Sequence, residues 1–95
     1  MIHILYPFMT LEDNTEIVHS EAIVQDGIEQ VRVCIEKPVE GGFYYAECLL
    51  PEYTWSKIDG FNTEEIQNFQ NMIEDMAHII IRLARAGGFE DASGF

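Results

Sequence analysis

The stretch from Phe61 to Gly88 constrains the fold of this chain more strongly than any other part of the sequence. Asn62 is a residue type that caps helix N-termini, and Glu65, three residues later, completes the pattern of a capping box. The glycine pair at 87–88 can adopt the left-handed conformation that ends a helix. Between these start and stop signals, the sequence predicts one long helix over residues 63–86.

Apolar residues recur along this predicted helix at alternating spacings of three and four, the pattern of a helix with one buried face. The members of this apolar ridge are Ile66, Phe69, Ile73, Met76, Ile80 and Leu83. At 1.5 Å per residue the helix would be about 36 Å long, which exceeds the width of a small sheet. Met72 and Ile79 extend the apolar surface to one side of the ridge, so we expect a second contact there, such as one with a symmetry mate.

The chain upstream of the helix carries the signals of β-strands. Segments rich in β-branched and aromatic residues, separated by turn residues, predict strands at about residues 2–8, 16–25, 28–37 and 43–50. Asp26 and Gly27 form a strong hairpin signal between the second and third of these strands. In the third strand, Val31, Val33 and Ile35 recur at every second position, so one face of that strand belongs to the core.

These elements predict a single domain over residues 1–95 with an α+β fold. A three- to four-stranded antiparallel meander would present its apolar face to the long C-terminal helix, and residues 87–95 would form a tail. Ninety-five residues are enough for one such core, and they leave little stability to spare for unpaired buried groups.

Acidic residues dominate the charge of the chain. Seventeen Asp and Glu stand against five Lys and Arg, which gives a formal net charge of −12 and a pI near 4.3. The cations are few and scattered, at Arg32, Lys37, Lys57, Arg82 and Arg85. Such a chain lacks the basic footprint that binds nucleic acid directly and would be repelled by anionic membranes, whereas a basic protein partner would be attracted. Because neither a signal peptide nor a membrane span is predicted, we expect a cytoplasmic location.

No group of residues carries a specific chemistry, so we expect no enzyme activity, no catalytic or cofactor-binding residues and no metal site. His3, His19 and His78 lack the spacing of metal ligands. Cys34 and Cys48 lie in predicted strands without a Cys-x-x-Cys motif, which favours buried free thiols. The 17 carboxylates are too numerous for the sequence alone to single out an acid–base pair.

Five residues are candidates for binding a protein partner. They are Tyr53, Trp55, Met72, Ile79 and Phe95. Tyr53 and Trp55 fall within residues 51–60, which we interpret as a connecting loop, where amphipathic rings can anchor a partner. The interpretation favoured for both rings is that they cover the end of the core, and partner binding is the second interpretation. Phe95, in the polar tail, would either be free or dock on a neighbouring molecule.

Part of the chain resembles the HicB-like antitoxin domain, over roughly residues 31–83. The motifs that carry the resemblance are Ile35-Glu36-Lys37, Gly41-Gly42-Phe43-Tyr44-Tyr45-Ala46-Glu47-Cys48, Leu50-Pro51, and the helix entry with Gly60, Thr63, Glu64 and Glu65. Members of that family are acidic and non-enzymatic, and they bind and mask a small basic RNA-cleaving toxin, often as oligomers and often with an added DNA-binding segment. The resemblance therefore implies an antitoxin-like binding domain, although residues 1–27 are an extension that the family pattern does not require, and no DNA-binding segment is recognised.

Two other functions agree with the composition. An inhibitor from a phage or mobile element would use its acidic surface to imitate the charge of nucleic acid, and its carboxylates would be spaced in rows like phosphates. A homo-oligomeric interaction module would use the overhanging part of the helix together with Met72, Ile79 and Phe95. The favoured hypothesis is the acidic domain that engages a basic partner, with Tyr53 and Trp55 as anchors.

Overall fold

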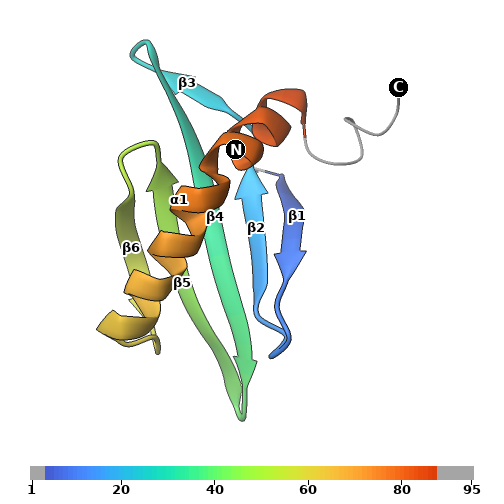
Figure 1. Ribbon diagram of the computed structural model, residues 1–95, viewed down its shortest axis with the longest axis vertical. Helices are drawn as coiled ribbons and strands as arrows, with labels where there is room; N and C mark the ends of the chain where they lie inside the picture. Colours follow the sequence, from blue (N-terminus) through green and yellow to red (C-terminus); the bar gives the residue numbers. More distant parts are fainter. Residues whose placement is uncertain (1–3, 88–95) are drawn as a thin grey trace.

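The computed structural model of the protein, which describes residues 4–87, has an α+β fold with an antiparallel sheet and one C-terminal helix. The elements are β1 (Leu5–Thr10), β2 (Glu16–Ser20), β3 (Ile23–Gln25), β4 (Ile28–Val39), β5 (Gly42–Leu50), β6 (Thr54–Asp59) and α1 (Thr63–Ala86). The predicted class is confirmed, but the predicted count of three to four strands is wrong, because the sheet has six. Neighbouring strands follow the order β1-β2-β4-β5-β6, and β3 pairs with β4 alone (Figure 1).

One source of the extra strands is the predicted strand over residues 16–25, which the structure divides into β2 and β3. At the break, the Ser20 hydroxyl donates to the carbonyl of Glu21 at 2.8 Å and accepts the backbone N–H of Arg32 at 3.0 Å. The backbone N–H of Ala22 donates to the carbonyl of Ala84 in α1 at 3.1 Å. The break therefore leaves these backbone groups bonded, as buried backbone requires.

The other extra strand, β6, lies within the predicted loop over residues 51–60. It pairs antiparallel with β5, with Ser56 opposite Glu47 and Trp55 opposite Cys48. The register shifts further along the pair, where Lys57 has a φ of 54°. A bulge of this kind breaks the two-residue periodicity by which a strand is recognised in a sequence.

The predicted helix is confirmed over the whole range 63–86, because its end signals are local. The Asn62 side chain accepts the backbone N–H of Glu65 at 2.8 Å, and the Glu65 carboxylate accepts the backbone N–H of Asn62 at 3.0 Å, which completes the capping box. At the other end, Gly87 adopts the left-handed conformation with φ 83°. Within residues 4–87, neither α1 nor any other helix combines the length and the apolar character that crossing a membrane requires.

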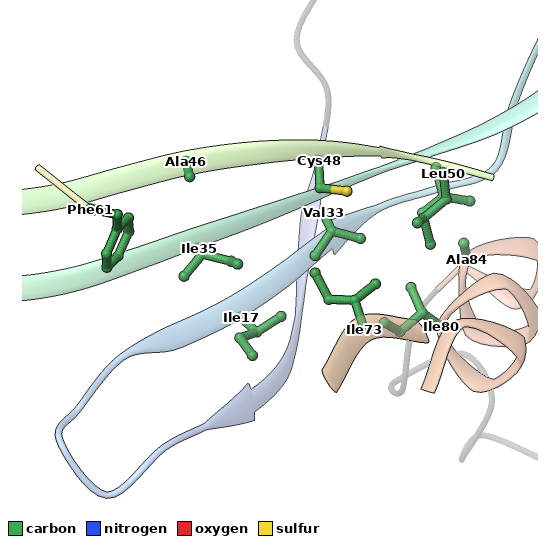
Figure 2. Packing of buried hydrophobic residues seen from close by; sticks show 11 residues of the cluster. Ile17, Val33, Ile35, Ala46, Cys48, Leu50, Phe61, Ile73, Ile80 and Ala84 are labelled. Atoms are coloured by element: carbon green, nitrogen blue, oxygen red, sulfur yellow. The ribbon is translucent and has the colours of Figure 1, made fainter. Parts of the chain in front are cut away.

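The apolar ridge of α1 lies on the sheet, as the sequence predicts. In Figure 1 the helix runs diagonally in front of the strands, and in Figure 2 its buried side chains meet those of β2, β4 and β5. The core cluster consists of Ile17, Val31, Val33, Ile35, Ala46, Cys48, Leu50, Phe61, Ile73, Ile80 and Ala84. Ile66, Phe69 and Met76 of the ridge are partly buried against it. The sheet therefore has one face covered by α1.

Candidate functional site

The face of the sheet opposite α1 is called here the helix-free face. It carries two groups of charged side chains. Because side chains alternate along a strand, burial of Val33 and Ile35 beneath α1 turns Cys34 and Glu36 to this other face. The register then places Glu47 of β5 opposite Cys34. Two groups of side chains result, one centred on Glu47 and one on Glu36.

The first group, the Glu47 cluster, joins three strands through one buried carboxylate. Glu47 is 8% exposed. One of its oxygens lies 3.3 Å from Nε of Arg32, and the other lies 3.4 Å from Nζ of Lys57 and accepts a 2.8 Å hydrogen bond from the Tyr45 hydroxyl. A carboxylate buried to this degree needs such partners. Because both oxygens are engaged, Glu47 has a structural role in holding β4, β5 and β6 in register.

The thiols and the phenol near Glu47 have raised pKa values. Burial raises the pKa of the Cys34 thiol above its ordinary value, and burial together with contacts to Cys34 and Glu47 raises the pKa of Tyr45. On the helix side, burial raises the pKa of Cys48 to about 12. All three groups therefore stay protonated at neutral pH, whereas a reactive cysteine needs a lowered pKa. Both cysteines are free, and because they lie on opposite faces of the sheet they do not face one another.

The second group lines a depression that we call the acidic hollow. Its volume is about 300 Å³, and its lining residues are Thr10, Asn14, Glu16, Glu36, Pro38 and Phe43. Glu16 of β2 is paired directly with Glu36 of β4, and Pro38 is paired with Phe43 across the β4–β5 hairpin. Both carboxylates are exposed, and the Phe43 side chain is 60% exposed. The acidic hollow thus combines two neighbouring carboxylates with an open aromatic ring.

None of the ion pairs within residues 4–87 involves a carboxylate of the acidic hollow. Arg32 and Lys57 are held by Glu47, as described above. Lys37 lies 3.5 Å from Asp13, and Arg85 makes a two-pronged contact with Glu29 at 2.6 to 3.0 Å. Four of the five Lys and Arg residues are therefore engaged with other carboxylates.

The structure places the proposed anchors Tyr53 and Trp55 against the core. Both rings are partly buried, and the indole Nε1–H of Trp55 donates to Oε1 of Gln70 in α1 at 2.9 Å. Burial and the charge of Glu74 raise the pKa of the Tyr53 hydroxyl. These contacts place both rings against the core, which is the interpretation that the sequence favoured for them.

Of the other three candidates, the two on α1 differ in burial. Met72 is partly buried against the core, whereas Ile79 is 39% exposed on α1. Phe95 lies outside the described residues. Of the two residues that were expected to extend the apolar surface of α1, Ile79 is exposed and Met72 is partly buried.

His19 is the buried histidine of the described residues, and its contacts are structural. His19 is fully buried, its Nδ1–H donates to the carbonyl of Ser20 at 2.7 Å, and burial lowers the pKa of its ring. Its ring lies 5.7 Å from that of Tyr6. Between residues 4 and 87, His, Cys, Asp and Glu side chains do not form a group of three that could hold a metal ion.

Comparison with protein-family models, with curated proteins and with solved structures finds no match to this chain in any of the three. The geometry described above and the charge of the chain are therefore what indicate its function. Of the two groups on the helix-free face, the Glu47 cluster contains two cations for its one carboxylate, whereas no ion pair within residues 4–87 involves the carboxylates of the acidic hollow. The acidic hollow is accordingly the better candidate site for binding.

Proposed function

We propose that this chain is a small, acidic, non-enzymatic protein-binding domain that engages a basic partner through the helix-free face of its sheet. The observation that carries the proposal is the unequal pairing of charge on that face. Glu47 has two cations of its own, whereas no Lys or Arg in the described part of the chain forms an ion pair with Glu16 or Glu36. A basic protein would supply the missing countercharge.

The antitoxin-like character of the domain is part of this proposal. It is supported by the resemblance to HicB-like domains and by the net charge of −12, and the raised pKa of the Cys34 and Cys48 thiols agrees with it. The buried free thiols of Cys34 and Cys48 agree with a reducing compartment, so we place the protein in the cytoplasm.

The geometry favours this function over the two alternatives. A mimic of nucleic acid needs a long row of carboxylates, but the row across the sheet contains Glu16, Glu36, Tyr45 and Asp59, so an aromatic residue interrupts it after two acids. A homo-oligomer would bring together two chains that each carry a net charge of −12, and such chains repel one another. Binding of a basic protein requires neither a long row of carboxylates nor contact between two acidic chains.

Affinity capture tests the proposal. The protein is immobilised beside an unrelated acidic domain of equal net charge, a lysate of the source cells is passed over both at low salt, and the retained proteins are identified by mass spectrometry. We expect a small basic protein to be retained by this chain alone, to be released as salt increases, and to form a complex of defined stoichiometry when purified. Equal retention of basic proteins by both columns would contradict the proposal, since it would show only general charge attraction.

A further inference from the structure

We propose that the acidic hollow receives an arginine side chain of the basic partner, an inference that rests on the proposed function and names the contact that carries it. The hollow lies on the part of the helix-free face that is formed by β2 and the β4–β5 hairpin. Three features of the described residues point to this occupant. They are the facing carboxylates, the position of the nearby cations, and the exposed aromatic ring.

The facing carboxylates are the first feature. Glu16 and Glu36 are direct cross-strand partners, a position in which side chains stand about 5 Å apart and like charges destabilise the sheet. A single cation placed between them would remove this repulsion and interact with both. The hollow is therefore electrostatically complementary to one positive group.

Residues 4–87 do not place that positive group beside the two carboxylates. Lys37 follows Glu36 directly, but the alternation of the strand turns its side chain to the other face, where it pairs with Asp13. Arg32 lies on the helix-free face, and its guanidinium is held by Glu47. Among the described residues, then, no cation is paired with Glu16 or Glu36, and a cation from another molecule can take this place.

The aromatic ring decides between arginine and other cations. Phe43 and Pro38 give one side of the hollow an apolar wall, and Phe43 is exposed enough for a planar group to lie against its ring. A guanidinium can stack on an aromatic ring and at the same time donate hydrogen bonds to two carboxylates, whereas an ammonium is a point charge without that planar geometry. A volume of about 300 Å³ leaves room for the methylene stem of the arginine as well.

Fluorescence anisotropy at low salt tests the inference. The probe is a fluorescein-labelled peptide of alternating glycine and arginine, with a second peptide in which lysine replaces every arginine. The Glu16→Gln/Glu36→Gln variant removes both carboxylates of the hollow. Its matched control is Glu52→Gln/Asp75→Asn, which removes two exposed carboxylates elsewhere, and circular dichroism checks that both variants remain folded.

We expect the hollow variant to bind the arginine peptide about tenfold more weakly than the unmodified protein, and the control variant to change binding about twofold or less. Phe43→Ala should weaken binding of the arginine peptide about threefold. The lysine peptide should bind the unmodified protein more weakly than the arginine peptide does. If the hollow variant and the control variant weakened binding of the arginine peptide equally, the inference would be overturned and the proposed function would stand. If the unmodified protein bound neither peptide, the inference would be overturned, whereas the proposed function would still be decided by the affinity capture described above.

Discussion

Glu16 of β2 and Glu36 of β4 face one another directly across the sheet, and neither carboxylate has a cation from the described part of the chain as a partner. We predict that Glu36→Gln raises the free energy of unfolding by roughly 0.5 kcal/mol, because the substitution removes the repulsion between like charges. Urea denaturation followed by the fluorescence of Trp55 measures this gain. The gain should shrink as salt is added, since ions screen exposed charges.

Glu52→Gln is the control for this prediction, because it removes an equal charge from an exposed position that has no acidic cross-strand partner in the register of the sheet. A gain of the same size in the control would mean that lower net charge, and not the Glu16–Glu36 pair, accounts for the effect.

Gly60 precedes the helix entry and has no room for a side chain. Its φ is 97°, and a Cβ built there would overlap the ring of Tyr44. Gly41 also has a positive φ, but a Cβ there meets nothing within 4 Å. We predict that Gly41→Ala costs roughly 1 kcal/mol of stability for its backbone conformation, and that Gly60→Ala costs about 1–3 kcal/mol more for the overlap. Chemical denaturation of the two variants measures the difference, and equal losses would show that the Tyr44 ring moves aside freely.

Ile73 and Ile79 provide a matched pair on α1, because Ile73 is 1% exposed and Ile79 is 39% exposed. Replacing Ile73 by alanine should lower the free energy of unfolding by about 2–5 kcal/mol, since it opens a cavity under the helix. The same change at Ile79 should cost less than about 1 kcal/mol. Similar losses at both positions in urea denaturation would contradict the burial of the apolar ridge on the sheet.

His19 should make stability depend on pH. Burial lowers the pKa of its ring below the ordinary value of 6.5, so the unfolded chain binds protons more readily than the folded chain. As pH falls below about 6.5, stability should therefore decrease until the folded-state pKa is reached. The free energy of unfolding is measured between pH 5.5 and 7.5, a range above the ordinary pKa values of carboxylates.

His19→Asn should flatten this dependence, because asparagine can still donate to the Ser20 carbonyl but does not titrate. His78→Gln, on the exposed side of α1, is the matched control and should keep the dependence. If the free energy of unfolding of His19→Asn still decreased at lower pH as in the unmodified protein, another titratable group would account for the dependence.

The helix could be predicted from the sequence because its signals are local. Asn62, Glu65 and Gly87 act within a few residues of the helix ends, and the ridge follows a single period. Strand β6 could not be predicted in the same way, because its pairing with β5 involves a register shift and its residues after Trp55 are mostly exposed. The break between β2 and β3 depends on the contact of Ala22 with Ala84, which no local pattern contains.

The candidate site was harder to predict than the fold. With 17 carboxylates in the sequence, Glu16 and Glu36 are not distinguishable from the others until the register places them opposite one another. Glu47 appears in the sequence as one acid among many, although its partners come from three strands. Tyr53 and Trp55 were candidate anchors for a partner. Their packing depends on β6, which the sequence did not predict.

The central claim is that a basic partner docks on the helix-free face at the acidic hollow, and mapping of amide chemical shifts by NMR tests it most directly. The isotope-labelled protein is titrated with the arginine peptide at low salt. We predict that the largest shifts cluster at the amides of Glu16, Glu36 and Phe43. Shifts that cluster instead on α1 around Ile79, with the β2 and β4 amides unchanged, would contradict the claim.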